Sequence, residues 1–410
     1  MELQGVRAKW TAHDDPPREG GQGQVLRGRG ENGQSVAIKI ARQARSRMAQ
    51  ECASLQEIAR EDPRAGEWCV QVLDHGTAGD GRDFFVLPWY EDTLESWCER
   101  QPPLESLLLG LERAAATVVR LHRSHADLAR VRVHRDLKPP NFLVRDQNGR
   151  VDVVLADLGV AKDGKLLVAT RQTGVFTPHF APMEQMLPVN AVADVRQDVH
   201  GLGATLFACL TGTIPRSIVA RDTLWTAEAT RIVYLAGRGA SRSGDEVAEY
   251  QQLRGLPLER FIDFDEAHAL LPSDEQRLFH ALEERLGRRC AEPGAGARAL
   301  AELLLPTLRK ALAPNPRDRL HEASQIYASL QLARDAACVL LGVPREPTGA
   351  PMAATSAAGS DSGPYSTPTV PDSSGLPSVI ATAVPTGTGN TPRAEATVDS
   401  WDESEESAPL

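Results

Sequence analysis

Lysine is scarce in this sequence of 410 residues. Only six of its 45 basic residues are lysines, namely Lys9, Lys39, Lys138, Lys162, Lys165 and Lys310. Arginine is therefore the usual cation of the chain, and a lysine inside a structured stretch suggests a task for a compact point charge. The net charge of −10 provides no basic field for a nucleic-acid backbone, so we expect no nucleic-acid partner.

The sequence also lacks the patterns of metal-binding, secreted and membrane proteins. Its six cysteines are scattered, with no CxxC pair and no metal-ligand spacing. We find no secretory signal at the N-terminus, and no apolar run approaches the roughly 20 residues that span a bilayer. We therefore expect reduced thiols, a cytoplasmic location and no membrane span.

Acidic residues gather near the C-terminus. From Arg345 onward the chain has two basic and nine acidic residues, so this stretch carries −7 of the net charge of −10. Its composition is mostly Ala, Ser, Thr, Gly and Pro, which bury too little apolar surface to offset the entropy of ordering. Residues 345–410 are therefore predicted to be a disordered, acidic tail.

Short apolar runs alternate with turns over residues 1–88. A helix is predicted at Arg45–Arg60, because Met48, Cys52, Leu55 and Ile58 recur at helical spacing. Four runs read as strands, at Gln24–Arg27, Ser35–Ile40, Gln71–Leu73 and Phe84–Leu87. This region is predicted to be a small antiparallel sheet with one helix.

Residues 89–344 change to a mainly helical pattern. Three short strands are expected at Val131–Val133, Phe142–Val144 and Val151–Ala156. Segment 217–305 is polar and helix-prone. The long helices are predicted at Leu104–His122, Ala191–Thr211, Ala297–Leu312 and Ala323–Val343.

Two features of the first region suggest phosphate binding. Gly20, Gly21 and Gly23 lie between strand-like stretches, where backbone amides without a nearby Cβ can approach phosphate oxygens. An ordinary glycine hairpin is the alternative. Lys39 interrupts an apolar strand, which is costly without a partner, and Glu51 on the following helix is the candidate. A lysine that reaches water, with a surface-facing Glu51, is the alternative there.

A polar stretch of the second region carries the strongest signal. His134-Arg-Asp-Leu-Lys-Pro-Pro-Asn141 lies between two short apolar strands, which is poor material for a core. Asp136 could accept a hydroxyl proton, Lys138 could neutralise phosphoryl charge and Asn141 could bind a metal. Asp157, in Ala-Asp-Leu-Gly, ends an apolar strand and is a hard oxygen ligand suited to Mg²⁺.

In this order, the glycine loop, the Ala-Ile-Lys lysine, the helix glutamate, HRDLKPxN and DLG resemble the eukaryotic-type (Hanks-type) serine/threonine protein kinases, and most of all the bacterial ones. The resemblance covers about residues 5–335. It implies an α+β, two-lobed fold, with a small sheet lobe carrying one helix and a larger, mainly helical lobe.

The resemblance also implies roles for single residues. Asp136 is similar to the catalytic base, and Lys138 to the lysine that contacts the γ-phosphate. Asn141 and Asp157 resemble the ligands of two Mg²⁺ ions. Lys39 resembles the residue that holds the α- and β-phosphates and pairs with Glu51. The ATP-binding positions are Gly20, Gly21, Gly23, Val25, Ala37, Lys39 and Leu143, with Leu87, Pro88 and Tyr90 in the hinge.

The implied activity is transfer of the γ-phosphoryl of ATP to Ser/Thr hydroxyls of proteins, with autophosphorylation. One alternative is a pseudokinase that acts as a scaffold, but that needs a broken catalytic position, and the five positions Lys39, Glu51, Asp136, Asn141 and Asp157 are all present. A small-molecule kinase of similar fold is another, but such enzymes lack the HRDLKPxN lysine pattern and an activation segment that ends as here at Glu184. Arg319 resembles the arginine that anchors this glutamate.

Three departures from the family pattern stand out. Arg18 replaces the first glycine of the loop, and Pro182-Met-Glu184 replaces Ala-Pro-Glu. Segment 217–305 is longer than the family needs, which leaves a docking surface or a solvated elaboration as its interpretation.

Control by phosphorylation is a further expectation. Arg135 precedes the catalytic aspartate, and Arg47 shares a helix face with Glu51, so both could receive a phosphate on Thr170 or Thr173. The alternative is that both threonines only solvate a loop. In the tail, Thr369-Val-Pro-Asp372 resembles the phosphothreonine ligands of forkhead-associated domains, although a plain tether is the simpler interpretation.

Overall fold

The structure is a computed structural model, and it describes residues 1–13, 15–19, 23–42, 48–125, 131–147, 150–158, 162–163, 179–187 and 194–345. The chain divides after Ala358, so all described residues belong to its first part. The predictions for Gly20, Gly21, Arg47, Thr170, Thr173 and the tail beyond Arg345 lie outside these ranges.

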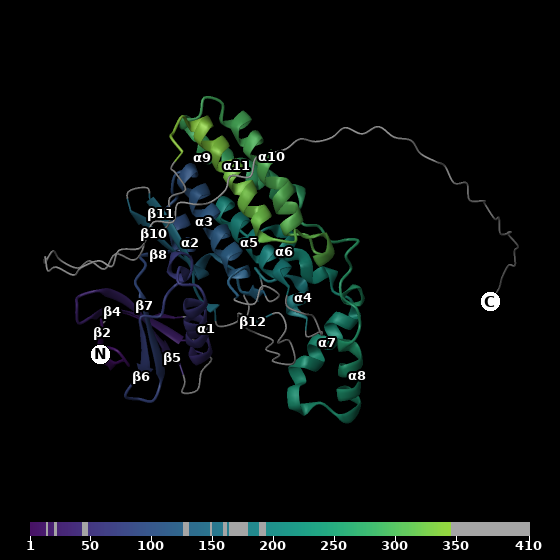
Figure 1. The fold of residues 1–410 in the computed structure, drawn as a ribbon. Coiled ribbons are helices and arrows are strands. Elements are labelled where there is room, and N and C mark those ends of the chain that lie inside the picture. Colours follow the sequence, from purple (N-terminus) through teal and green to yellow (C-terminus); the bar gives the residue numbers. More distant parts are fainter. Residues whose placement is uncertain are drawn as a thin grey trace, which may run out of the picture. The chain divides into compact units, whose positions relative to one another are not determined.

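The N-terminal region forms a seven-stranded antiparallel sheet in the order β1-β2-β4-β5-β7-β6, with β3 paired to β4 (Figure 1). Strand β5 holds Lys39 at the centre, opposite Val25 on β4 and Phe85 on β7. The strands are β1 (Glu2–Gln4), β2 (Lys9–Ala12), β3 (Arg18–Glu19), β4 (Gly23–Gly30), β5 (Ser35–Ala41), β6 (Asp74–Thr77) and β7 (Asp83–Pro88).

The two faces of this sheet have different tasks, because successive side chains of a strand point to opposite sides. On one face, Val36, Ile38, Ile40, Phe84 and Val86 are buried in an apolar cluster. The other face presents Val25, Ala37, Lys39, Phe85 and Leu87, which share the register of the central strands. Four of the predicted nucleotide-binding residues, Val25, Ala37, Lys39 and Leu87, thus lie together on the second face.

Helix α1 (Met48–Glu61) packs against β7, with Met48, Cys52, Leu55 and Ile58 buried as the spacing predicts. After the helix, the chain passes through η1 (Ala65–Glu67) and attaches to the second region through backbone hydrogen bonds. The Val70 amide donates to the Leu155 carbonyl at 2.9 Å, and the Leu155 amide donates to that of Trp68 at 2.8 Å. This connection ties the end of α1 to the strand that precedes Asp157.

One sequence prediction in this region is wrong. Gln71–Leu73 is not a strand, and the strand begins only at Asp74. The Asp74 carboxylate, 1% exposed, accepts hydrogen bonds from the backbone amides of Arg7 and Ala8 and from the Trp10 indole. The predicted apolar run precedes strand β6. The strand itself begins at Asp74, whose carboxylate accepts the hydrogen bonds from the N-terminal hairpin.

The second region is mainly helical. Short strands β8 (Asp92–Thr93), β10 (Phe142–Gln147) and β11 (Arg150–Leu155) form one small sheet, and β9 (Arg132–Val133) pairs with β12 (Lys162–Asp163). The larger helices are α2 (Leu94–Glu99), α3 (Leu104–His122), α5 (Val195–Thr211), α9 (Pro272–Leu286), α10 (Pro293–Ala311) and α11 (Ala323–Leu341). Shorter ones are η2 (Pro139–Asn141), α4 (Met183–Met186), α6 (Arg216–Val219), η4 (Ala220–Leu224), η5 (Gly239–Ser241), η6 (Leu258–Arg260), η7 (Gly287–Arg289) and η8 (Pro316–Asp318).

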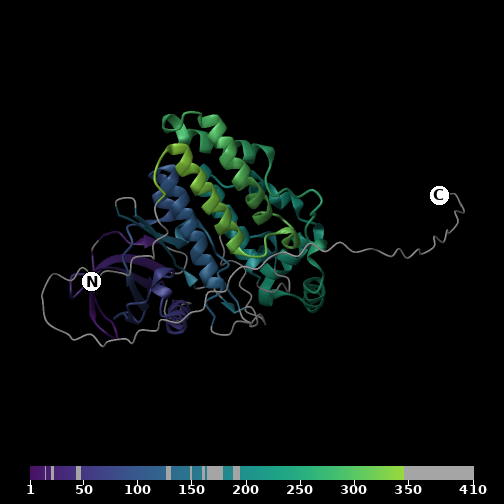
Figure 2. The same cartoon turned by 45° about the horizontal axis from the view of Figure 1, so that its top comes forward.

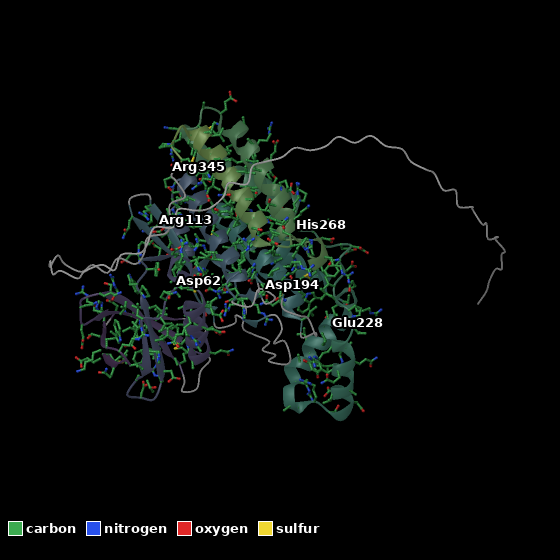
Figure 3. The ribbon with its side chains drawn as sticks, viewed as in Figure 1. Asp62, Arg113, Asp194, Glu228, His268 and Arg345 are labelled. Atoms are coloured by element: carbon green, nitrogen blue, oxygen red, sulfur yellow. The ribbon has the colours of Figure 1, made fainter. Side chains whose placement is uncertain are left out.

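Helix α3 packs against several elements of this region, including α11, β11 and α5. Helix α11 lies along it (Figure 2), and β11 packs on another side, where Arg113 of α3 (Figure 3) pairs with Asp152. The predicted helix at Leu104–His122 is confirmed residue for residue. No helix within the described ranges is long and apolar enough to cross a membrane.

Segment 217–305 is packed structure rather than a solvated elaboration. Leucines of α9 and α10 enter the main core. Helices α7 (Ala227–Arg238) and α8 (Gly244–Arg254) instead form an apolar cluster of their own with α4. Its buried members are Met183, Leu187, Ala229, Ile232, Leu235, Tyr250, Phe261 and Ile262. A docking role for this segment stays a prediction.

Candidate active site

Lys39, Glu51 and Asp157 meet between the two regions. The Lys39 ammonium donates to both carboxylate oxygens of Glu51, with Nζ–Oε1 and Nζ–Oε2 distances of 2.9 and 2.7 Å. Its Nζ also lies 3.6 Å from Oδ1 of Asp157. The Lys39 and Glu51 side chains are only 14% and 2% exposed, so the pair is screened little by solvent. The lysine is thus held where β5, α1 and the end of β11 converge.

Burial and charge act in opposite directions on this ion pair. Burial raises the pKa of Glu51 to about 7, although the Lys39 ammonium opposes the rise. For Lys39, burial favours the neutral amine, but the Glu51 and Asp157 carboxylates outweigh it and raise the pKa. Two carboxylates thus share one ammonium. The surplus negative charge indicates that the site is built to hold further positive charge.

The catalytic loop candidates are connected to one another. The Lys138 ammonium donates to Oδ2 of Asp136 at 2.8 Å, and the Asn141 amide nitrogen donates to the Asp136 carbonyl at 2.7 Å. Asn141 ends η2, which Pro139 begins, and its carbonyl accepts from the Ala156 amide at 2.9 Å. Because Asp157 follows Ala156 in the chain, this last bond places Asn141 beside Asp157.

A buried carboxylate on α5 holds the backbone of this loop. Asp198 accepts hydrogen bonds from the His134 and Arg135 amides, both at 2.7 Å, and contacts Nε2 of His122 at 2.9 Å. Arg135 has a φ of +71°, which a non-glycine residue adopts only when its surroundings enforce it. Although burial opposes it, the hydrogen bond from His122 lowers the pKa of Asp198.

Sequence reasoning missed this positioning role. It predicted the helix at Ala191–Thr211, which contains Asp198, but gave this aspartate no role of its own. An acidic residue on a helix this apolar was the available signal. Gly201, one turn further, adds a reason for the close fit: a Cβ there would lie 3.1 Å from both Cβ and the carbonyl oxygen of Leu137. The glycine lets the candidate catalytic loop pack directly on α5.

The residues suit a magnesium ion. Asp157 has a φ of +60°, and its Oδ1 is buried without a hydrogen-bond partner in the described part of the chain. The side-chain nitrogen of Asn141 donates to the Asp136 carbonyl, so the side-chain oxygen is the atom available to a metal. Hard oxygen donors of this kind are the ligands that Mg²⁺ prefers. Among the described residues, no cluster of three or more His, Cys, Asp or Glu side chains could hold a metal without added ligands.

Three of the predicted adenine-side residues, Val25, Ala37 and Leu87, lie on the sheet face that carries Lys39. Pro88 lies opposite Val36 at the end of β7 and so belongs to the register of the other face, and Leu143 lies on β10 of the small second sheet. Ala37, Leu143 and Tyr90 are partly buried against the same core, and Arg145 lies over the Tyr90 ring at 4.8 Å. Gly23 is the one loop glycine within the described ranges. A Cβ there would lie 2.3 Å from the Ile40 carbonyl oxygen, so only glycine fits.

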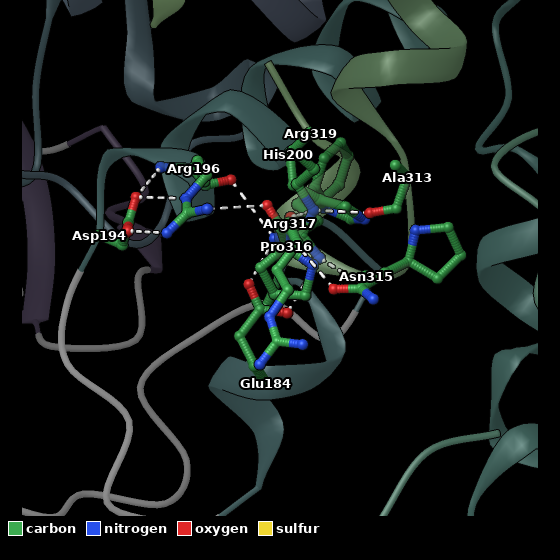
Figure 4. A network of polar contacts seen from close by, with 12 residues as sticks. Glu184, Asp194, Arg196, His200, Ala313, Asn315, Pro316, Arg317 and Arg319 are labelled. Atoms are coloured by element: carbon green, nitrogen blue, oxygen red, sulfur yellow. Dashed lines mark hydrogen bonds and ion pairs between the residues drawn. The ribbon is translucent and has the colours of Figure 1, made fainter. Parts of the chain in front are cut away.

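The predicted anchor between Glu184 and Arg319 is confirmed. Arg319, whose side chain is fully buried, forms two hydrogen bonds with the Glu184 carboxylate and donates to the carbonyls of Ala313 and Pro314 (Figure 4). Beside it, Arg196 pairs with Asp194 and donates to the Pro316 carbonyl. The network fixes α4, at the end of the predicted activation segment, to the loop before α11.

Known proteins give an independent comparison. The family model of the protein kinase domain matches residues 19–320. Serine/threonine-protein kinase PknK of Mycobacterium tuberculosis is 35% identical over 150 residues, which are 35% of this chain and 12% of that protein. Serine/threonine-protein kinase pkn3 of Myxococcus xanthus is 31% identical over 208 residues, or 48% of this chain and 37% of that protein. PknL of Mycobacterium tuberculosis is 34% identical over 164 residues, or 38% and 37%.

These matches span well under half the length of each of these curated relatives. The match to the family model, in contrast, extends over most of this chain. It agrees with the observed sheet lobe and helical lobe, so the predicted two-lobed α+β fold is confirmed. The chain belongs to the protein kinase domain family, and the relatives it resembles are bacterial serine/threonine-protein kinases.

Proposed function

We propose that the chain transfers the γ-phosphoryl of ATP to serine and threonine hydroxyls of proteins. The observation that carries this proposal is the meeting of Lys39, Glu51 and Asp157 next to a loop that connects Asp136, Lys138 and Asn141. No catalytic position of the family is broken, and the named relatives are serine/threonine kinases.

Each side chain has a task that its position allows. Lys39, held by Glu51, would neutralise the α- and β-phosphates, while Asp136 would orient the acceptor hydroxyl and accept its proton. Lys138 would balance charge on the transferred group. Magnesium, when bound by Asp157 and Asn141, supplies positive charge that offsets the phosphate oxygens. The chain's own contribution is mainly positioning and electrostatic stabilisation.

The roles proposed for the nucleotide-binding residues follow from the resemblance to the family. Val25, Ala37 and Leu143 would enclose the adenine ring, and Leu87, Pro88 and Tyr90 would form the hinge. Gly20 and Gly21 would complete the phosphate loop.

We also propose a cytoplasmic location, since all six cysteines are free thiols. A phosphothreonine-reading partner at Thr369 would extend this function to the tail.

One observation among the described residues supports activation by phosphorylation. Arg135 is half-buried, and its Nε has no hydrogen-bond partner within the described part of the chain. Burial lowers the pKa of Arg135. A guanidinium in this state is stabilised by an arriving anion, so we propose that it receives a phosphate on Thr170 or Thr173.

Radiolabelled ATP tests the activity directly. The full chain is incubated with magnesium and γ-labelled ATP, alone and with a protein acceptor, beside the Asp136→Asn variant. We expect label on serine and threonine in the wild type and at least a hundredfold less in the variant, at unchanged nucleotide affinity. Nucleotide binding without any transfer by the wild type would instead indicate a pseudokinase scaffold.

A further inference from the structure

A glutamine at the end of the predicted activation segment contacts the loop that carries Asp136. Gln185 lies in α4, and its side-chain nitrogen donates to the Arg135 carbonyl at a distance of 2.6 Å. The two residues are 50 positions apart along the chain, so this bond joins two separate parts of the candidate active site. Because a carbonyl oxygen only accepts hydrogen bonds, the amide nitrogen is the end of the glutamine that has to face it.

The bond holds the peptide unit that precedes the candidate base. The Arg135 carbonyl and the Asp136 amide belong to one planar peptide group. The amide donates to Nδ1 of His134 at 3.2 Å, while the carbonyl accepts from Gln185, so both polar ends of this group are held. Arg135 also has the φ of +71° that its surroundings must enforce, and the bond from Gln185 is one of the contacts that do so.

Helix α4 is a firm support for this contact. The buried Arg319 donates two hydrogen bonds to Glu184, the neighbour of Gln185 (Figure 4). Arg221, which is also buried, donates to the carbonyl of Ala181 just before the helix. A helix of only four residues needs such tertiary contacts to keep its position. The anchor at Glu184 thus extends, through Gln185, to the backbone of the candidate catalytic loop.

Packing alone does not explain a glutamine at this position. Its side-chain oxygen is buried without a hydrogen-bond partner in the part of the chain that the structure describes, and an unpaired acceptor of this kind is destabilising. A leucine of similar size would avoid that cost. Among the described residues, the bond to Arg135 is the one hydrogen bond that the Gln185 side chain forms. A polar residue that leaves one atom unpaired to make one bond is expected where function requires the bond.

We propose that Gln185 is a positioning residue for Asp136: through the Arg135 carbonyl, it orients the loop so that the Asp136 carboxylate faces the acceptor hydroxyl. The effect on transfer rests on the proposed function, whereas the hold on the loop does not. Loss of the bond leaves the Asp136 carboxylate chemically intact but free to turn away. Turnover therefore falls, while the affinity for ATP stays the same.

Steady-state kinetics of the full chain with a protein acceptor measure this effect. We expect Gln185→Leu to lower kcat at least tenfold at an unchanged KM for ATP. Gln185→Glu keeps the shape but replaces the donor by a carboxylate oxygen, so at about pH 8 it should lose as much as Gln185→Leu. A wild-type kcat in Gln185→Glu would overturn the proposal, because the donated bond would then be unnecessary.

Gln197→Leu is the matched control for these variants. Gln197 is a buried glutamine on α5 whose side-chain oxygen also has no partner within the described ranges, and its side chain makes no hydrogen bond there to the loop. The control should keep the wild-type kcat. An equal loss in Gln185→Leu and Gln197→Leu would contradict a specific role for Gln185.

A double-mutant cycle separates positioning from general support. In Asp136→Asn the side chain no longer accepts the proton of the acceptor hydroxyl, so its orientation has little effect on turnover. Addition of Gln185→Leu to Asp136→Asn should therefore lower kcat less than about twofold further. A second tenfold loss in that background would show that Gln185 acts by a route other than Asp136, and would overturn the proposal.

Hydrogen exchange tests the hold on the loop without any transfer. We expect amides of residues 131–141 to exchange at least fivefold faster in Gln185→Leu than in the wild type, and at the wild-type rate in Gln197→Leu. Unchanged exchange in Gln185→Leu would contradict the hold, whatever the kinetics show. If the wild type transfers no phosphate, the proposed function fails and the effect on transfer fails with it, while hydrogen exchange still decides whether Gln185 holds the loop.

Discussion

At the scale of single residues, the balance of charge around Lys39 has a consequence for pH. Burial raises the pKa of Glu51 to about 7, so the carboxylate takes up a proton as the pH falls through that value. The ion pair with Lys39 then weakens, and the ammonium is no longer held in place. We expect the affinity for an ATP analogue to fall below about pH 7, and the fall to be absent in Glu51→Gln, which binds weakly at every pH.

Stability should respond to pH in the opposite direction. The pKa of Glu51 is higher in the folded chain than its ordinary value of 4.5, so its ionisation opposes folding. Its contribution to stability is full below pH 4.5 and is lost as the pH rises through about 7. Calorimetry of the wild type and of Glu51→Gln across this range measures the effect. For the binding prediction above, an affinity for the ATP analogue that rises as the pH falls would contradict this account of the Lys39–Glu51 pair.

A second prediction at this scale concerns Asp198. Its carboxylate accepts the amides of His134 and Arg135, and hydrogen bonds to charged groups are worth about 1.5–3 kcal/mol each. Asp198→Ala should therefore lose about 3 kcal/mol of stability in urea unfolding and more than tenfold in turnover. Asp194→Ala is the matched control on the same helix; it removes a half-exposed N-cap of α5 and should leave turnover near the wild-type value. Equal turnover in both variants would rule out the positioning role.

At the scale of elements, a buried ion pair joins α3 to α11. Nε of Arg334 lies 3.0 Å from Oε2 of Glu112, and the two side chains are 2% and 1% exposed. Removal of one partner leaves an uncompensated charge in the core, so Glu112→Ala and Arg334→Ala should each cost about 3–5 kcal/mol in urea unfolding.

The double variant Glu112→Leu with Arg334→Leu should recover much of that loss, because burial of two charges is itself unfavourable. The exposed pair Arg231–Glu249, which links α7 to α8, is the control, and its removal should change stability little. If the single and double variants of the buried pair prove equally unstable, packing rather than charge determines the junction.

At the scale of the whole molecule, the sequence predicts the fold and the composition of the site better than the links within it. Lys39 and Asp157 stand out because a charged residue in or after an apolar strand needs a reason. The helix limits of α3 follow from the periodicity of its leucines. The support by Asp198 and the late start of β6 depend on residues distant in sequence. The separate core of α7 and α8 is hidden because its apolar residues are few and are interrupted by arginines.

The central claim is that Lys39, Glu51, Asp136, Asn141 and Asp157 form one site for a nucleotide and its metal. Calorimetric titration with a non-hydrolysable ATP analogue, with and without magnesium, tests it most directly in the wild type and in Asp157→Asn. We predict that magnesium strengthens binding to the wild type at least tenfold and has almost no effect on the variant, while the melting temperature of the variant stays close to that of the wild type. An equal response to magnesium in both chains would contradict the account.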